Sequence, residues 1–377
     1  MSLTIVPVKS ASERKQFITM VWDIYQDDPN WVPPLIADRK KLLDPERNPF
    51  WSHAEIEMFL AKRDGKNVGR IAAIINWAHN QVHNDKVGFF GFFESENKVS
   101  TAHALFAAAA EWLAERDMEV MRGPVNPSIN DEAGLLVDGF DDPPQILMTY
   151  NPEYYATLIE SYGFTKVKDL YAWKLTPDFL SPKLERVQKA VRERENLTIR
   201  TFRFSPKSAF QQDIEILRDI YNIAWEPNWG AVKMNREEFN ALAADLKPVA
   251  AKDIVLIAES NNRPVGFALA LPDINQALIR NRSGGMVGAL WHLLTGKKRI
   301  TRGRIIVLGV VPPFQRRGID AALYYEIGQR MVVDHKYIEA EASWVLEDNE
   351  MMNRAARMMK GEIYKTYRLY DKTIKEN

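Results

Sequence analysis

The spacing of apolar and polar residues predicts a mixture of strands and helices that occurs twice along the chain. Residues 3–8 read as a short strand and residues 12–25 as a helix. Two further strands, 58–63 and 68–72, flank a polar turn at residues 64–67 and predict a hairpin. The same order of strand, helix and hairpin begins again at residue 197, so the pattern indicates a duplicated unit.

Short identical segments support the duplication, because they recur at nearly one offset of 196 to 198 residues. The recurring segments are Asp23-Ile24-Tyr25 with Asp219-Ile220-Tyr221, Pro29-Asn30-Trp31 with Pro227-Asn228-Trp229, Gly69 with Gly266, and Gly163 with Gly361. A repeat of half the chain predicts two copies of one domain rather than a solenoid of short units. We expect an N-terminal domain at 1–175, a linker at 176–196 and a C-terminal domain at 197–377.

A strand, a basic turn and a helix follow one another between residues 304 and 331. The apolar run 304–308 predicts the strand, two prolines end it, and apolar residues at helical spacing resume from Ala321. Between them lies Gln315-Arg316-Arg317-Gly318. The first N–H groups of a helix lack intrahelical partners, a glycine lets the backbone approach an anion, and arginines attract it. The stretch therefore predicts a phosphate-binding turn.

This turn resembles the acyl-CoA-binding motif of the GNAT superfamily (Gcn5-related N-acetyltransferases). Gln315 and Gly318 match two fixed positions, whereas Asp320 stands where the family has glycine or alanine. The resemblance covers both copies and implies an α/β (α+β) fold, with two tandem GNAT-like domains. Each would have a central mixed, mostly antiparallel sheet flanked by helices. It also implies acetyl-CoA or another acyl-CoA as the cofactor. The residues expected to bind it are Leu308, Val310, Gln315, Arg316, Arg317, Gly318, Ile319, Asp320 and Asn349.

The first copy departs from the motif. Its corresponding strand, 87–93, is followed by Glu94-Ser95-Glu96-Asn97-Lys98, with neither the arginine pair nor the turn glycine. Two carboxylates at a helix start repel phosphate, so we expect this copy to be degenerate in the CoA motif. Its loop 122–134 is rich in short polar residues, and Asn126, Ser128 and Asn130 are candidate substrate contacts. Turns that satisfy their own backbone are the alternative.

Two other regions bear on the acceptor. Trp225 and Trp229 follow the first helix of the second copy, where the resemblance implies the border of the acceptor site; packing is the alternative, since Trp31 repeats the position. The second copy also carries 21 additional residues between its hairpin and the motif strand. They predict an apolar helix (286–294) between basic residues. Three interpretations stay open for this helix: a lid over an acyl chain, a helix that rests on an anionic surface, or an ordinary helix that packs on the domain with solvated ends.

Acyl transfer to an amine needs a base for the amine and a proton for the departing thiolate. Strand alternation in 339–344 puts Glu339 and Glu341 on one face, where two acids favour exposure to solvent. Glu341 is the candidate base. The resemblance implies a tyrosine on the helix 350–360, but that helix has none. Tyr364, beyond it, is the candidate acid.

Composition removes other classes of function. Lys+Arg and Asp+Glu are each 50, so no large nucleic-acid-binding surface is expected. The absence of cysteine excludes disulfides and thiolate sites, the six histidines show no ligand spacing beyond the pair His79 and His83, and no metal is expected. These two histidines lie in a stretch, 76–85, that reads as a loop. No apolar run reaches membrane-spanning length, and a cytoplasmic location is expected.

The sequence therefore predicts an acyl-CoA-dependent N-acyltransferase, most simply an acetyltransferase. Its donor would bind the C-terminal domain, and its acceptor would be a small-molecule or peptide amine of unknown identity. A homodimer stays open. Three alternatives stay open as well: a non-catalytic acyl-CoA-binding or regulatory protein, a Fem-like aminoacyl transferase, which would need a tRNA-binding surface, and a purely structural module.

Overall fold

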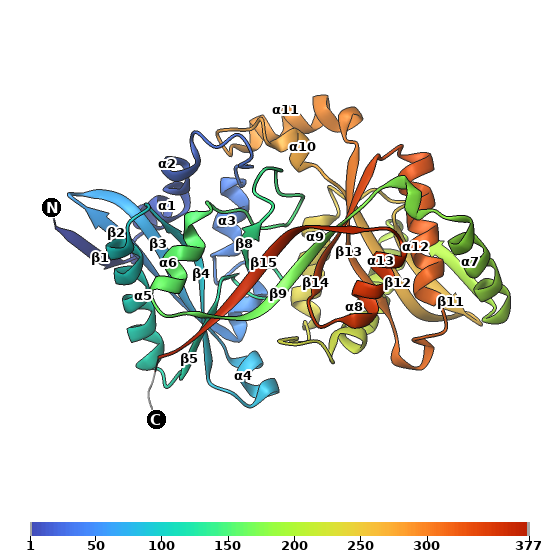
Figure 1. Ribbon diagram of the computed structural model, residues 1–377, viewed down its shortest axis with the longest axis horizontal. Coiled ribbons are helices and arrows are strands. Elements are labelled where there is room, and N and C mark those ends of the chain that lie inside the picture. Colours follow the sequence, from blue (N-terminus) through green and yellow to red (C-terminus); the bar gives the residue numbers. More distant parts are fainter. Residues whose placement is uncertain (1, 375–377) are drawn as a thin grey trace. The chain divides into compact units, whose positions relative to one another are not determined.

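The computed structural model describes residues 2–374 and divides them into two compact units (Figure 1). Unit 1 contains the described residues up to Leu170, the segment Leu278–Leu294 and the described residues from Lys365 onward. Unit 2 contains Tyr171–Ala277 and Thr295–Tyr364. Each unit thus takes segments from both halves of the sequence. The domain boundaries inferred from the repeat stay a prediction.

Unit 1 is built on a sheet with the strand order β1-β2-β3-β4-β5-β15, in which only β4 and β5 run parallel. The strands are β1 (Leu3–Pro7), β2 (Ala54–Arg63), β3 (Lys66–Asn76), β4 (Val87–Ser95), β5 (Val120–Gly123), the short β6 (Val125–Asn126), β7 (Glu132–Ala133) and β8 (Leu135–Asp138), and β15 (Glu362–Thr373), which belongs to this unit from Lys365 onward. Its helices are α1 (Ala11–Thr19), α2 (Val21–Tyr25), α3 (Ile36–Leu42), α4 (Trp77–His83), α5 (Val99–Ala114) and α6 (Tyr154–Ser161).

Helix α5 covers one face of this sheet because its buried side chains recur at helical spacing. Leu105, Phe106 and Ala109 are buried and pack with Phe90 and Phe93 of β4. The helix predicted at 12–25 is interrupted at Met20, which ends α1 and begins α2.

The stretch 76–85, predicted as a loop, is helix α4, so that prediction was wrong. Asn76 caps the helix by accepting a hydrogen bond from the N–H of His79 at 3.2 Å, and Asn84 ends it in the left-handed conformation.

Unit 2 repeats the plan with the order β10-β11-β12-β13-β14-β9, in which β13 and β14 run parallel. Its strands are β9 (Thr165–Leu175), β10 (Leu197–Thr201), β11 (Val255–Ser260), β12 (Arg263–Pro272), β13 (Arg302–Val310) and β14 (Glu339–Leu346). Its helices are α7 (Pro182–Arg194), α8 (Lys207–Trp225), α9 (Arg236–Leu246), α12 (Ile319–Gln329) and α13 (Glu350–Met358). The inserted segment forms α10 (Asn275–Leu278) and α11 (Met286–Gly296), and its residues Leu278–Leu294 belong to unit 1.

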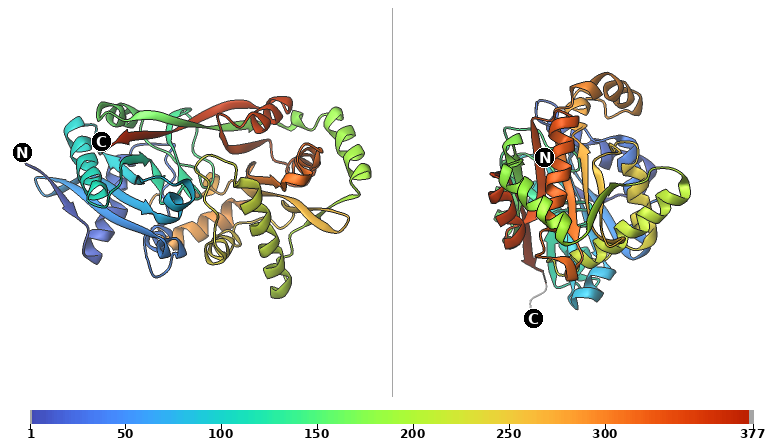
Figure 2. Two further views of the ribbon diagram at one scale, coloured as in Figure 1. Left: turned by 90° about the horizontal axis from the view of Figure 1, so that it is seen from below. Right: turned by 90° about the vertical axis from the view of Figure 1, so that its right-hand side faces the viewer.

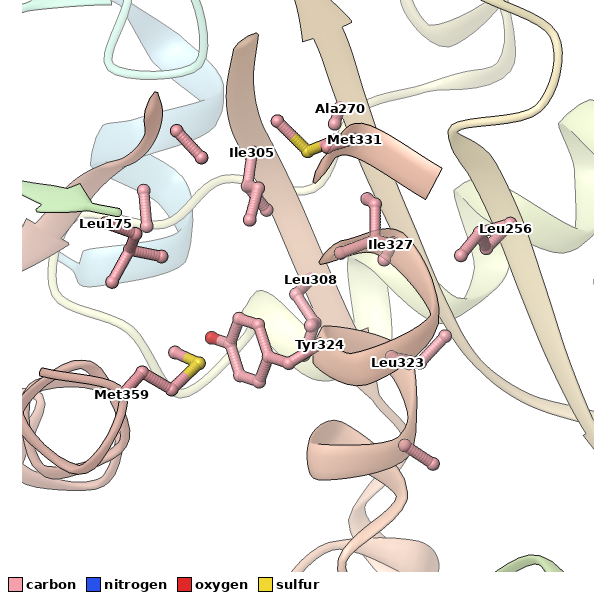
Figure 3. Packing of buried hydrophobic residues seen from close by; sticks show 14 of the residues in the cluster. Leu175, Leu256, Ala270, Ile305, Leu308, Leu323, Tyr324, Ile327, Met331 and Met359 are labelled. Atoms are coloured by element: carbon pink, nitrogen blue, oxygen red, sulfur yellow. The ribbon is translucent and has the colours of Figure 1, made fainter. Parts of the chain in front are cut away.

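The core of unit 2 lies between α12 and the sheet, and Figure 3 shows part of it. Leu323 and Ile327 of α12 are fully buried, and they pack in one cluster with Leu256 of β11 and Leu308 of β13. Helix α8 covers the opposite face through Ile214, Leu217 and Ile220. The motif strand β13 is therefore covered on both sides, which fixes the direction of the turn that follows it.

The final strands are exchanged between the two copies. The last strand of the chain, β15, pairs with β5 in unit 1 over Tyr370–Thr373, whereas β9, the last strand of the first copy, lies beside β14. Each sheet keeps the predicted mixed, mostly antiparallel layout with helices on it, which confirms the expected fold class.

Candidate functional site

The turn after β13 has the conformation that the sequence predicted. Val310 ends the strand, a 3₁₀ turn spans Pro312–Phe314, and α12 begins at Ile319. Figure 2 shows this orange part of the ribbon from two further sides. Gly318 has φ 86° and Arg316 φ 60°, both in the left-handed region. No side chain caps the start of α12, so Asp320, in the first turn, does not close the helix end. The backbone N–H groups of this turn are thus not covered by a capping side chain.

The polar side chains of the turn have different roles. Gln315 donates from Nε2 to the carbonyl oxygen of Val310 at 3.0 Å and so holds the turn to the end of the strand. Arg316 is exposed. Arg317 forms an ion pair with Glu195 at 2.8 Å, and its guanidinium lies over the ring of Phe314. Both arginines are exposed, and among the described residues Arg316 is the one of the two that forms no ion pair with a carboxylate.

The connector helix α7 packs against this turn. A Cβ placed on Gly318 would lie 2.8 Å from Cγ2 of Val191, and Arg192 pairs with Glu326 of α12 at 2.7 Å. Gly318 is therefore required twice, once by its positive φ and once by the close approach of α7.

The second feature of unit 2 is a buried carboxylate on the strand next to the motif strand. Glu341 is fully buried, so the exposure expected from strand alternation was wrong. Its carboxylate accepts hydrogen bonds from the hydroxyls of Ser343 and Tyr364. Arg304 lies directly across from it in the β13–β14 register and places Nε 3.5 Å from Glu341 Oε1. A buried carboxylate needs such partners, and these explain why it is tolerated here.

Arg304 completes the network. Its side chain is buried, and it donates from Nε to the hydroxyl of Ser343 at 2.8 Å and from Nη2 to the Ser343 carbonyl at 3.1 Å. Sequence reasoning missed both residues. Ser343 could have been found, because it lies two positions from Glu341 and so on the same face of the strand. Arg304 carried no such signal, since it precedes a run of apolar residues.

The structure thus brings the two candidate catalytic residues, Glu341 and Tyr364, together. The parallel pairing of the strands covers Arg302–Ile305 and Glu339–Ala342 and ends there. The second half of β13, with Leu308 and Val310, lies beyond that pairing and leads into the turn.

Two asparagines organise the start of α13. Asn349 caps the helix by accepting a hydrogen bond from the N–H of Met352 at 3.2 Å. Asn353 was not predicted. It is buried, donates to the carbonyl oxygen of Leu346 at 2.9 Å and accepts a hydrogen bond from the indole of Trp173 at 3.1 Å. It therefore ties α13 to the end of β14 and to β9.

The predicted acceptor residues are divided between the units. Trp225 is the last residue of α8 rather than a loop residue; it stacks on Tyr221, and its ring lies 2.8 Å from a Cβ placed on Gly309 of the motif strand. Trp229 lies in the loop that follows and is partly buried. Trp31, in unit 1, is buried between Tyr25 and Trp22.

The polar loop of unit 1 mostly satisfies its own atoms. Asn126 accepts a hydrogen bond from the N–H of Phe92 at 2.6 Å and donates to Glu132 at 3.2 Å. Ser128 donates to Asp131 at 2.6 Å and accepts from the N–H of Asn130 at 3.2 Å. The part of these three residues in substrate binding stays a prediction.

In unit 1, residues of the neighbouring β6 lie against β4, the strand that corresponds to the motif strand. A Cβ on Gly91 would lie 1.7 Å from the carbonyl oxygen of Val125, and Asn126 takes the N–H of Phe92. Where unit 2 has its basic turn, Glu96 pairs with Arg63 and Lys98. The degeneracy of the first copy in the CoA motif stays a prediction.

Unit 1 also holds a buried acid that sequence reasoning treated only as a source of repulsion. Glu94 accepts hydrogen bonds from Tyr155 at 2.7 Å and Tyr25 at 2.9 Å, and Arg70 lies 3.4 Å away. Burial raises the pKa of Glu94, and burial followed by the nearby Glu94 charge raises the pKa values of both tyrosines.

Comparison with known proteins assigns the chain. No family model matches the sequence. The chain is 35% identical over 382 residues to a bacterial ceramide synthase of Caulobacter vibrioides, covering 99% of this chain and 98% of that protein. It is 34% identical over 371 residues to protein YghO of Escherichia coli, covering 96% and 93%. The chain belongs to the family of these two proteins.

Solved structures agree on the fold. A tandem GNAT protein from the clavulanic acid biosynthesis pathway aligns over 100% of both chains with a TM-score of 0.59 at 10% identity. A GCN5-related N-acetyltransferase from Sphaerobacter thermophilus covers 100% of this chain and 96% of its own, with a TM-score of 0.53 at 14% identity. The predicted tandem GNAT fold is confirmed. Within the described residues, no helix is long and apolar enough to cross a bilayer.

Proposed function

We propose that this chain is an acyl-CoA-dependent N-acyltransferase that joins an acyl chain to the amino group of a long-chain amino alcohol. The observation that carries the proposal is the Glu341–Tyr364 hydrogen bond on the strand beside the motif strand. The relation to a ceramide synthase supports the class of product, because a ceramide is the amide of such an amino alcohol. The relation to a ceramide synthase narrows the class of acceptor amine to long-chain amino alcohols, and it favours a long-chain acyl donor over acetyl-CoA.

The donor would bind at the turn of unit 2. The left-handed Gly318 and the uncapped start of α12 fit a pyrophosphate, since helix N-terminal N–H groups and their dipole favour anions. Arg316 supplies an exposed positive charge at the same turn. The backbone of β13 at Leu308 and Val310 would hold the thioester end and polarise its carbonyl. Asp320 does not cap the helix, so its carboxylate leaves the turn open.

Glu341 and Tyr364 would move the proton. The amine nitrogen forms a bond to the thioester carbon, the carbon–sulfur bond breaks, and one proton leaves the amine. Glu341 accepts that proton, directly or through water. Tyr364 gives its hydroxyl proton to the departing sulfur and recovers one across its hydrogen bond with Glu341. Arg304 provides the opposite charge that the buried carboxylate needs, so we assign it a positioning role.

The absence of cysteine allows a direct assay, because every free thiol released must come from the donor. We expect thiol release from a long-chain acyl-CoA when a long-chain amino alcohol is present, with the matching amide found by mass spectrometry. A panel of shorter acyl-CoA donors and of peptide amines measures specificity. Binding of acyl-CoA with no amide from any amine would overturn the proposal in favour of a non-catalytic acyl-CoA-binding protein.

A further inference from the structure

Helix α11 exposes an apolar face to solvent. Met286, Val287, Leu290, Trp291 and Leu294 are between 53 and 86% exposed, and Ala289 is the buried residue of this helix. Their spacing places them on one side of a helix. Single exposed apolar residues are normal on a protein surface, but five on one short helix indicate an interaction surface.

The segment that carries this face is fixed to unit 1 by hydrogen bonds. The guanidinium of Arg282 donates to the carbonyl oxygens of Trp31, Gln26 and Asp28 at 3.0 to 3.2 Å. The carbonyl oxygen of Arg282 accepts a bond from the indole of Trp22 at 2.6 Å. Because the segment is held in this way, turning the apolar face inward would break several hydrogen bonds to unit 1.

The charges around α11 select its partner. Residues 274–300 contain five basic residues and no acidic one, in a chain whose total charge is zero. Arg280 precedes the helix, and Lys297, Lys298 and Arg299 follow its end directly. An apolar helix that exposes leucine and tryptophan on one side and has basic residues at its ends can bind at the surface of an anionic membrane, because apolar burial and headgroup attraction act together. A second copy of the chain carries no net negative charge to match these basic residues.

The length of α11 fixes the mode of binding. Eleven residues span about 16 Å at about 1.5 Å per residue, roughly half of a hydrocarbon core. We propose that α11 lies in the surface of an anionic lipid membrane, with its apolar face among the acyl chains and its flanking basic residues among the headgroups. This inference rests on α11 and its flanking residues and not on the proposed transfer reaction.

The lack of cysteine again provides a specific probe. A single Leu290→Cys change, labelled with an environment-sensitive dye, reports from the apolar face only. We expect a blue shift and increased emission with vesicles of phosphatidylcholine and phosphatidylglycerol, and a smaller response with phosphatidylcholine alone. Val82→Cys, on α4 and equally exposed, is the matched control and should not respond. Equal responses at the two positions, or none at Leu290→Cys, would overturn the proposal.

Vesicle flotation of unlabelled protein tests the two halves of the proposal separately. Leu290→Glu/Leu294→Glu should lower binding at least about tenfold by removing apolar burial. Lys297→Ser/Lys298→Ser/Arg299→Ser should lower it about fivefold per charge and reduce its sensitivity to salt. Analytical sedimentation without vesicles tests whether a second copy of the chain occupies this face instead. A dimer that Leu290→Glu/Leu294→Glu dissociates would show that a second copy covers this face, and would overturn the membrane proposal.

Discussion

The hydroxyl of Tyr364 donates a hydrogen bond to the carboxylate of Glu341, which is fully buried on β14. The two residues are 23 positions apart and both lie in the Thr295–Tyr364 segment of unit 2, Glu341 on β14 and Tyr364 at the start of β15. A phenol and a carboxylate in contact can exchange a proton, and the pair lies beside the strand that leads into the basic turn.

The first prediction concerns Glu341 as the base. Glu341→Gln keeps the shape of the side chain but cannot accept the proton, so kcat should fall by about 10²- to 10⁴-fold while donor binding stays unchanged. Steady-state thiol release and CoA titration measure the two quantities. Glu339→Gln, on the same strand and paired with Arg302 at 3.3 Å, is the matched control and should retain activity. Equal losses in the two variants would point to a structural role.

The second prediction separates positioning from stability at Arg304. Arg304→Met leaves the buried Glu341 without its cationic partner and should lower the free energy of unfolding by about 3–5 kcal/mol. In a Glu341→Gln background the same change should cost about 1–3 kcal/mol less, because no buried charge is left unpaired. Denaturant unfolding of the natural chain, the two single variants and the double variant measures this coupling energy. Additive effects would mean that the two residues do not interact energetically.

A third prediction follows from the contact between Gly318 and Val191. Gly318→Ala should destabilise the protein by more than the roughly 1–2 kcal/mol of a left-handed alanine, because its Cβ would meet Val191 at 2.8 Å. Gly65→Ala is the matched control, since Gly65 has φ 81° and open space around it. The double variant Gly318→Ala/Val191→Ala should lose about 1 kcal/mol less unfolding free energy than the sum of the losses in the two single variants. Equal unfolding free energies for the Gly318→Ala and Gly65→Ala variants would contradict the tight packing of α7.

The fourth prediction is a pH dependence of stability that involves His79. This ring is buried against Phe89 and His83, and burial lowers the pKa of His79 to about 3. It is therefore neutral beside Asp85 at physiological pH, although the two lie 3.4 Å apart. In the unfolded chain the imidazole of His79 binds a proton near pH 6.5. The stability that the neutral His79 ring contributes is therefore fully present above that pH. It should be lost as the pH falls toward 3, by up to about 4–5 kcal/mol.

Asp85 acts in the opposite direction, because burial raises its pKa and the folded state then holds that proton more tightly. Unfolding free energies at pH 7 and pH 4 measure the net effect. His79→Phe should lose less stability between these pH values than the natural chain, whereas His103→Phe, at a partly exposed histidine, should behave like the natural chain. An unchanged slope in His79→Phe would show that this histidine is not the source.

The sequence predicted the fold well where apolar spacing and local chemistry agree. The strand–turn–helix around Gly318 was found because prolines, a glycine and helical spacing all mark the same boundaries. Helix α4 was missed because only seven residues carry it and its start depends on the cap at Asn76. The exchange of β9 and β15 had no local signal, since each strand has the same pattern whichever sheet it joins.

The candidate site was predicted in part. Glu341 and Tyr364 were chosen for their chemistry, and their contact depends on the long-range pairing of β14 with its neighbours. The burial of Glu341 was missed because alternation on a strand tells which residues share a face but not what covers that face. Arg304, which makes that burial tolerable, lies on another strand, and its register with Glu341 is fixed only in the folded sheet.

The central claim is that unit 2 holds the donor and unit 1 does not, and calorimetric titration with CoA tests it most directly. One molecule should bind per chain, Gly318→Glu should abolish binding, and Glu96→Gln in unit 1 should leave it unchanged. Thermal unfolding of each variant, compared with the natural chain, establishes that both are folded. Unchanged CoA affinity in a folded Gly318→Glu protein, or a second molecule bound per chain, would contradict the account.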